Sequence, residues 1–440
     1  MRRGDPATLG RMGRSTRAGY PSARAALFAA LTVTAVGLGN GRAQRPVPLR
    51  TANGPWLVRA AKVLPVDAAP LEAGEVLVLD GKIAAIGRSL ECPPGTQVLD
   101  GGEGFLVPGI VELHCHVGVS GGDINDTVLP HNMELRTLDL VLADSPELQR
   151  AVEAGVTTTL IIPGSGSTIG GLGTLVKTAG PSFDERLIRY PGALKIALHA
   201  RGGNPARRAG DLGSTRLGLH HMLKQVLADA KDYHEALAGF EAGDASDRPE
   251  HNPRLDALRG LWRGDFPVIF HAYGVNDTMT AIRIVKWGLG ADMVISHGVY
   301  DSFKIADVLA ASGVPMNIGP RQFEFYESSY VGNAAALQAA GVPTSICTDA
   351  PVVPQEDLQV QAAMAVRLGL PAEAALRGLT LEPARAIGIA DRVGSLTVGK
   401  DADLCLFAGD PIDPRNAPTL VMVDGRIVID RRLDETASSR

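Results

Sequence analysis

The feature that most constrains the fold is a regular alternation of short apolar strands with helical segments through the middle of the chain. The expected strands span 156–162, 267–271, 292–297, 315–318 and 343–349, and helical segments follow the last four at 277–287, 302–311, 333–340 and 355–368. A helix precedes the first strand and begins at Ser145-Pro146, a capping residue before a first-turn proline. Repeated βα units of this kind predict a parallel sheet with right-handed crossovers.

The number of residues available indicates how this sheet closes. From Pro108 to Gly378 there are 271 residues, close to the about 250 that eight βα units need. We therefore expect an α/β fold with a (β/α)8 barrel of TIM type over 108–390, and an open doubly wound sheet is the alternative. Segment 199–264 is longer than a single helix that connects two barrel strands. We therefore expect it to form an excursion over one face of the barrel, with an amphipathic helix at 217–240.

Matching hairpins flank the barrel segment. Asp80-Gly81 separates two apolar runs near the start, and Asp424-Gly425 separates two near the end. Asp-Gly between alternating apolar residues is a strong signal for a tight hairpin turn. We expect one small composite β-sandwich domain from 56–107 plus 391–432; two unrelated hairpins are the alternative.

The first 43 residues differ from the rest. They hold seven arginines and one aspartate, whereas the remaining 397 residues carry a net charge of −11. An apolar run from Ala25 to Leu38 and the small residues of Gly41-Arg42-Ala43 complete the pattern of a secretory signal peptide at 1–43, with Met1 or Met12 as the start. The expected location is secreted or periplasmic, and a basic tail on a cytoplasmic protein is the alternative. We expect no membrane span, and the acidic body gives no reason to expect nucleic acid as a partner.

Polar residues at strand ends carry the chemistry. His114 and His116 lie two residues apart in one expected strand, so both imidazoles face the same side. His271, His297 and Asp349 each end a short apolar strand, at the rim where barrel enzymes place catalytic groups. Taken singly, each residue could be a helix cap or a hydrogen-bonded core residue; together they predict a site for a divalent metal, with nitrogen and oxygen donors that suit zinc.

Lys195 is a further candidate because it lies within the apolar strand 193–198. A buried lysine is costly unless it is paired or modified. Carboxylation by CO₂ would make it an anionic ligand that bridges two metals, and an ion-paired lysine is the equally weighted alternative.

The sequence resembles the amidohydrolase superfamily of metal-dependent hydrolases, and more narrowly its imidazolonepropionase-like and Xaa-Pro dipeptidase-like branch. The motifs that carry the resemblance are 108–116, 154–158, the strand-end histidines, Thr348-Asp349 and 394–404. The resemblance implies that His114, His116 and Asp349 bind one metal, and that carboxylated Lys195 bridges to a second metal held by His271 and His297. Asp349 would act as general base and acid, and His297 would orient the substrate as well as bind metal.

The same resemblance limits the types of reaction that we expect. Deaminase branches carry a glutamate three residues after the histidine that corresponds to His271, and here Gly274 occupies that position. We therefore expect hydrolysis of an amide or cyclic amide in a small-molecule or dipeptide-like substrate, with Tyr273 and Arg201 as substrate contacts. The alternatives are a metallo-exopeptidase of Xaa-Pro type and a non-catalytic binding protein on the same fold; the sequence leaves the oligomeric state open, a homo-oligomer included. The glycine-rich stretch 163–173 is expected to form a flap at the mouth or a plain connector.

Overall fold

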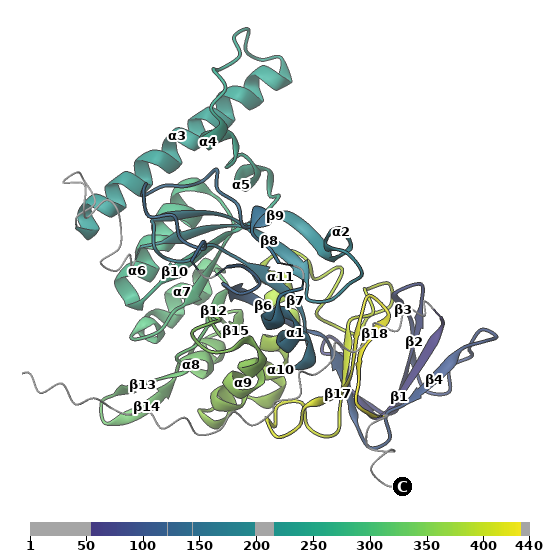
Figure 1. Ribbon diagram of the computed structural model, residues 1–440. Coiled ribbons are helices and arrows are strands. Elements are labelled where there is room, and N and C mark those ends of the chain that lie inside the picture. Colours follow the sequence, from purple (N-terminus) through teal and green to yellow (C-terminus); the bar gives the residue numbers. More distant parts are fainter. Residues whose placement is uncertain (1–53, 121, 143, 199–214, 433–440) are drawn as a thin grey trace, which may run out of the picture. The chain divides into compact units, whose positions relative to one another are not determined.

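The computed structural model describes residues 54–120, 122–142, 144–198 and 215–432. Within these ranges the strands form two eight-stranded sheets and one small hairpin sheet (Figure 1). The signal peptide expected at 1–43 lies outside the described residues. No helix in the described part of the chain is both long enough and apolar enough to cross a membrane.

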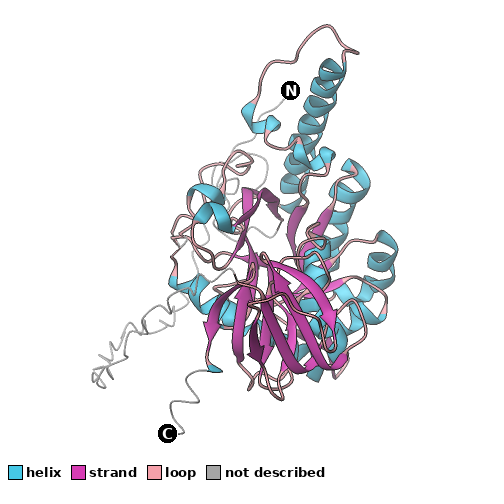
Figure 2. Cartoon of the chain, turned by 90° about the vertical axis from the view of Figure 1, so that its right-hand side faces the viewer, coloured by secondary structure: helices cyan, strands magenta, loops and turns pink. Residues whose placement is uncertain are grey.

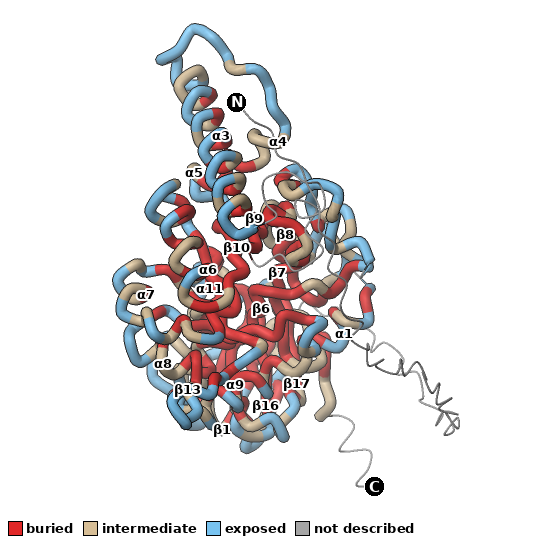
Figure 3. Tube along the Cα trace, turned by 90° about the vertical axis from the view of Figure 1, so that its left-hand side faces the viewer, coloured by how far each residue is buried: buried red, intermediate tan, exposed pale blue. Residues whose placement is uncertain are grey.

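The first of these sheets is the barrel. Its strand order is β15-β12-β11-β10-β9-β8-β7-β6. The bounds are β6 (Ile110–Cys115), β7 (Val156–Ile161), β8 (Ile169–Lys177), β9 (Leu187–Ala197), β10 (Val268–Ala272), β11 (Met293–His297), β12 (Met316–Ile318) and β15 (Thr344–Ile346). Most of their residues are buried (Figure 3), as expected for strands covered on both faces. The expected barrel fold is thereby confirmed.

One strand departs from the expected parallel repeat. β8 runs antiparallel to both β7 and β9, so these three neighbouring strands of the barrel sheet form an antiparallel meander. No helix of more than one turn separates them, because only α2 (Phe183–Arg186) lies between β8 and β9 in the described chain. Antiparallel neighbours can be joined by short connections, whereas parallel ones need a long crossover. The regular βα repeat therefore applies from β9 onward but not between β7 and β9.

Helices follow the later strands, as the sequence predicts, and Figure 2 shows helices beside the strands. Their bounds are α6 (Gly274–Ala281) with the π-helical η3 (Ile282–Leu289), η4 (Ser302–Ile305) with α7 (Ala306–Ser312), α8 (Asn333–Ala339), η5 (Gln355–Asp357) with α9 (Leu358–Arg367), α10 (Ala372–Leu379) and α11 (Leu381–Ala386). Ahead of β7 lie the 3₁₀ turn η1 (Thr137–Asp139) and α1 (Pro146–Glu153), and Ser145 caps α1 by accepting the Glu147 N–H at 3.2 Å. The hairpin of β13 (Phe323–Tyr326) and β14 (Ser329–Gly332) is inserted between β12 and α8.

The excursion contains the expected amphipathic helix. This helix, α3 (Arg216–Ala242), is followed by α4 (Pro253–Asp256) and α5 (Gly260–Arg263). Its buried Leu223 and Leu227 belong to the same apolar cluster as β10 residues Val268 and Phe270. α3 packs against η3, one of the helices around the barrel, and against α4, and Gly243 ends it in the left-handed conformation.

The second sheet is built from both ends of the described chain. Its order is β18-β17-β16-β5-β1-β2-β3, with β4 paired to β1. The bounds are β1 (Trp56–Val63), β2 (Leu71–Leu79), β3 (Lys82–Gly87), β4 (Gln97–Asp100), β5 (Phe105–Pro108), β16 (Leu404–Phe407), β17 (Pro418–Val423) and β18 (Arg426–Asp430). These strands follow one continuous path, and residues from both ends share one apolar cluster that includes Val58, Ile83, Leu406 and Ile427.

Both expected hairpins form, and their turns pack on each other. Asp80, Gly81, Asp424 and Gly425 all have positive φ, as a type I′ turn requires. A Cβ atom on Gly425 would lie 2.6 Å from the Cα of Gly81, so only glycine fits where the two turns meet. The repeated Asp-Gly pair therefore allows the two ends of the sheet to approach each other.

The glycine-rich stretch 163–173 is divided between a loop and a strand. Residues 163–168 connect β7 to β8, and Gly170, Gly171 and Gly173 lie within β8. Gly166 donates its N–H to Asn125 Oδ1 at 2.7 Å, and a Cβ atom on Gly166 would lie 2.6 Å from the same oxygen. The flap expectation is wrong for the second half of this stretch, which is part of the barrel wall.

A buried glutamate connects the first strand of the barrel, β6, to the segment after the last strand, β15. Glu112 in β6 has no exposed surface; its Oε1 accepts the His114 N–H at 3.1 Å, and its Oε2 accepts both the N–H (3.0 Å) and the hydroxyl (2.9 Å) of Thr348. His116 N also donates to Ala350 O at 2.7 Å. These bonds connect β6 to the segment after β15, so Glu112 helps to close the barrel.

A buried lysine joins the barrel to the second sheet. Lys177, at the end of β8, is 1 % exposed; its Nζ lies 3.1 Å from Asp401, 2.7 Å from Asp403 and 3.2 Å from Asp424. Burial favours the neutral amine, but the three carboxylates outweigh it and raise the pKa of Lys177. Asp401 and Asp403 belong to the motif 394–404, whose acidic residues thus have a structural role.

We expect Lys177→Met to lower the free energy of unfolding by about 3–5 kcal/mol, because three buried or half-buried aspartates lose their shared cation. The surface pair Lys231–Glu235 on α3 provides the control, since Lys231→Met should change stability by less than about 1 kcal/mol. Chemical denaturation measures both variants. Equal effects of the two substitutions would show that the Lys177 cluster does not stabilise the fold.

We expect Glu112→Gln to cost about 1–3 kcal/mol, because the amide places an N–H group against a buried donor of His114 or Thr348. Glu235→Gln on the surface of α3 is the matched control and should be near neutral. The denaturation midpoint of each variant is the measurement. A midpoint for Glu112→Gln equal to that of the control would contradict the closure role.

Candidate metal centre

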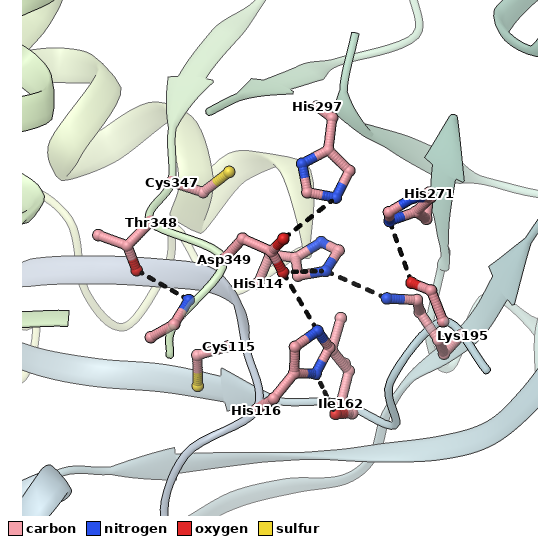
Figure 4. A network of polar contacts seen from close by, with 12 residues as sticks. His114, Cys115, His116, Ile162, Lys195, His271, His297, Cys347, Thr348 and Asp349 are labelled. Atoms are coloured by element: carbon pink, nitrogen blue, oxygen red, sulfur yellow. Dashed lines mark hydrogen bonds and ion pairs between the residues drawn. The ribbon is translucent and has the colours of Figure 1, made fainter. Parts of the chain in front are cut away.

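The structure brings together six residues that the sequence singles out. His114 lies in β6 and His116 directly follows it; Lys195, His271 and His297 lie in β9, β10 and β11. Asp349 follows β15, and the side chains of all six converge (Figure 4). They come from strands far apart in sequence, so the barrel is what assembles the group.

Their ligand atoms lie close to one another. Asp349 Oδ1 is 3.3 Å from His114 Nε2 and 3.2 Å from His116 Nε2, and Asp349 Oδ2 is 4.0 Å from His297 Nε2. Two groups of three have all their ligand atoms within 4.8 Å: His114 with His271 and His297, and His114 with His116 and Asp349. His114 belongs to both groups and thus occupies the middle of the cluster.

Backbone carbonyls fix two of the rings. His116 Nδ1 lies 2.8 Å from Ile162 O, and His297 Nδ1 lies 2.6 Å from Gly319 O. Because a carbonyl only accepts, each Nδ1 must carry the proton. In the neutral imidazoles each Nε2 therefore presents a lone pair to the cluster, the arrangement common to metal-binding histidines.

Burial determines the charge state of three histidines. His114 and His297 have no exposed surface, and His271 is almost fully buried. This burial lowers the pKa of all three imidazoles, and the neighbouring Lys195 acts in the same direction. They are accordingly neutral near pH 7 and able to act as ligands.

The donor set fits a divalent cation. His297 Nε2 is buried and has no hydrogen-bond partner in the described chain. Lone pairs of neutral imidazoles face a carboxylate across distances of 3.2–4.0 Å, and such an arrangement is repulsive without a positive charge between them. Nitrogen and carboxylate ligands of this kind suit zinc and related metals.

Lys195 approaches the same cluster from β9. Its Nζ lies 3.1 Å from His114 Nε2, and the side chain is completely buried. Burial lowers the pKa of this lysine to about 8. A substantial fraction of the amine is thus neutral near pH 8, the form that reacts with CO₂.

Two site residues adopt unusual backbone conformations. His297 has φ 80° and Asp349 has φ 54°, both in the left-handed region that favours glycine. Non-glycine residues rarely occupy this region, and such strain clusters at functional sites. The chain therefore turns sharply at the ends of β11 and β15 and directs these side chains into the cluster.

A cavity of about 630 Å³ opens onto the cluster. His116, His271 and Asp349 line it together with Tyr273, whose ring contacts His271 at 4.6 Å between centroids. Its volume is in the range of small-molecule sites. Arg201, the other expected substrate contact, lies outside the described residues.

Two residues of this region escaped the sequence analysis. Ser165 Oγ lies 3.1 Å from His271 Nδ1 and positions that ring from the loop after β7. Glu112 is fully buried, and its bonds to His114 and Thr348 support two segments that carry proposed ligands. Glu112 carried a readable signal, a charged residue inside an apolar strand, whereas nothing in the sequence marks Ser165.

Comparison with known proteins agrees with this geometry. The amidohydrolase family profile matches residues 105–428. An imidazolonepropionase of Aromatoleum aromaticum is 29% identical over 77% of this chain and 86% of its own length. The amidohydrolase tasK of Hapsidospora irregularis is 26% identical over 81% of this chain, which spans only 40% of that relative.

Solved structures share the architecture. The crystal structure of an amidohydrolase from Thermotoga maritima is 31% identical with a TM-score of 0.77, over 86% of this chain and 100% of that one. A Xaa-Pro dipeptidase with bound methionine, 16% identical with a TM-score of 0.52 over 85% of this chain and 99% of that one, shares the fold. The resemblance to the amidohydrolase superfamily is thereby confirmed, with an imidazolonepropionase among the relatives in sequence and a Xaa-Pro dipeptidase that shares the fold. The chain belongs to the amidohydrolase family and is a hydrolase that acts on carbon–nitrogen bonds.

Proposed function

We propose that the protein is a secreted or periplasmic metal-dependent amidohydrolase that cleaves an amide or cyclic amide bond. The observation that carries the proposal is the convergence of four histidines and Asp349 at a cavity large enough for a small molecule. The basic and apolar N-terminal segment supports export, because it has the composition of a signal peptide.

His114, His116 and Asp349 would hold one divalent cation, which we propose to be zinc. His271 and His297 would hold a second, with carboxylated Lys195 as the ligand between the two. When bound, such a cation supplies a Lewis acid for the carbonyl oxygen and lowers the pKa of a water molecule to about 7. The structural support is the unpartnered His297 Nε2 and the contact between Lys195 and His114.

Asp349 is placed to move the proton. Its Oδ1 lies 3.3 Å from His114 Nε2 and 3.2 Å from His116 Nε2, so a cation held between these groups would keep the carboxylate ionised. The ionised carboxylate can accept a proton from the attacking water. It borders the cavity, so it can return that proton to the departing nitrogen.

Two neighbours would orient the substrate. His297 is fixed by Gly319 O, and Tyr273 lines the cavity beside His271. Gly274 occupies the position of the deaminase glutamate and carries no acid to protonate a leaving amine. Amide hydrolysis is therefore favoured over deamination.

A substrate screen tests the proposal. Zinc-loaded and manganese-loaded protein is assayed with N-acyl amino acids, lactams and dipeptides, and we expect turnover of amides or lactams. Turnover of Xaa-Pro dipeptides alone would support the metallo-exopeptidase. Less than about a tenth of an equivalent of metal after metal-supplemented expression would indicate a non-catalytic binding protein.

We expect Asp349→Asn to lower kcat by about 10²–10⁴-fold, the contribution typical of general acid–base catalysis, with little change in the melting temperature. Asp247→Asn, in the exposed segment between α3 and α4, is the control and should keep full activity. Steady-state kinetics on a substrate from the screen measures both. Retained activity in Asp349→Asn would mean that another group carries the proton.

We expect Lys195→Met to bind one equivalent of metal less than the unmodified chain, because a carboxylated lysine would no longer join the two metals. Lys286→Met, which removes a surface pair with Asp292, should leave the metal content unchanged. Elemental analysis of the purified proteins gives the count. Equal metal content in both variants would indicate that the protein binds a single metal and that Lys195 is not a ligand.

A further inference from the structure

One wall of the cavity is aromatic and leads from the metal centre to an arginine. The ring of Tyr273, which contacts His271, meets the ring of Tyr300 edge to face at 5.6 Å. The guanidinium of Arg321 lies 5.2 Å from the Tyr300 ring centroid. All these residues line the cavity, and Arg321 is the only lysine or arginine among its lining residues in the described chain.

Arg321 is held in place from one side. Its Nε donates to Phe323 O at 3.2 Å, and its Nη2 donates to Glu324 Oε2 at 2.6 Å. Glu324 is 6 % exposed, and its Oε1 accepts the N–H of Tyr300 at 2.7 Å. One buried carboxylate therefore fixes both the arginine and the aromatic residue on which it stacks.

Tyr300 supports the same arrangement. Its φ is 65°, in the left-handed region that a tyrosine rarely adopts. The bond to Glu324 satisfies its backbone N–H in that conformation. The backbone turns so that the ring lies between Tyr273 and Arg321, as part of the cavity wall.

The remaining donors of Arg321 are available. A guanidinium has five N–H groups, and the two bonds above use two of them. Nη1 has no partner among the residues that the structure describes, and the side chain is 52% exposed. The guanidinium is already oriented and has free N–H donors along one edge. This arrangement matches a carboxylate, which binds arginine through two parallel hydrogen bonds.

We propose that Arg321 anchors a carboxylate of the substrate, so that the protein acts on amides that carry a free carboxylate. A single guanidinium, partly compensated by Glu324, suits a singly charged carboxylate better than a doubly charged phosphate. The inference rests on the proposed function for the reaction, but the binding of the acid does not depend on turnover. Arg201, which the sequence analysis proposed as a substrate contact, lies outside the described residues and stays a separate prediction.

The test compares acids with analogues that lack the acid. N-acetyl amino acids and their decarboxylated counterparts, such as N-acetyl-leucine and N-(3-methylbutyl)acetamide, are assayed with the unmodified chain and with Arg321→Gln, Arg321→Lys and Arg415→Gln. Arg415 is exposed and pairs with Asp413 outside the cavity, so its variant is the control. We expect Arg321→Gln to lower kcat/KM for the acid by about 10–100-fold, mainly through KM, and to leave the neutral analogue within about threefold. Arg321→Lys should recover part of the loss.

A binding assay separates this inference from the reaction. Thermal shift with the same acids should show stabilisation of the unmodified chain and of Arg415→Gln, and none of Arg321→Gln. Binding that depends on Arg321 without hydrolysis would contradict the proposed function and keep the carboxylate anchor. Hydrolysis of neutral amides alone, equal kinetics of Arg321→Gln and Arg415→Gln on the acid, or no acid binding would overturn the anchor.

Discussion

The candidate metal centre depends on one buried side chain, that of Glu112, which connects the first and last strands of the barrel. β15 is only three residues long, and Asp349 lies beyond its end in a strained conformation. Hydrogen bonds from His114 and Thr348 to the same side chain hold His114 close to Thr348, the neighbour of Asp349. The 3.3 Å separation of His114 Nε2 and Asp349 Oδ1 therefore follows from how the barrel closes.

The barrel buries two lysines, and their surroundings give them opposite properties. Lys177 lies among three aspartates that raise its pKa, so it is a permanent cation that joins the two sheets. Lys195 contacts an imidazole nitrogen instead, and burial lowers its pKa to about 8. A charged amine does not react with CO₂, whereas a neutral one does. The difference in carboxylate partners thus makes Lys195, and not Lys177, the residue suited to modification.

The sequence predicted the parts of the site that local patterns determine. A strand has a side-chain period of two, and barrel strands end at a common rim, so His114, His271, His297 and Asp349 could be placed without coordinates. The antiparallel β8 was missed because its glycines resemble a loop. Glu324 and Arg321 could not be foreseen, because their contacts depend on where the segment around Arg321 meets Tyr300 and the cavity. Such contacts join distant segments, and no periodicity in the sequence encodes them.

Hydrogen bonds within the polypeptide position most of the proposed metal ligands. Ile162 O and Gly319 O orient the rings of His116 and His297, and Ser165 contacts His271. Backbone strain at His297 and Asp349 costs about 1–3 kcal/mol at each residue and persists only because the surrounding packing imposes it. In small zinc domains the metal supplies the folding energy. Here a large apolar cluster spans the barrel strands and the helices around them. The barrel therefore has its own source of stability, and the proposed cation would enter a site whose proposed ligands are already in place.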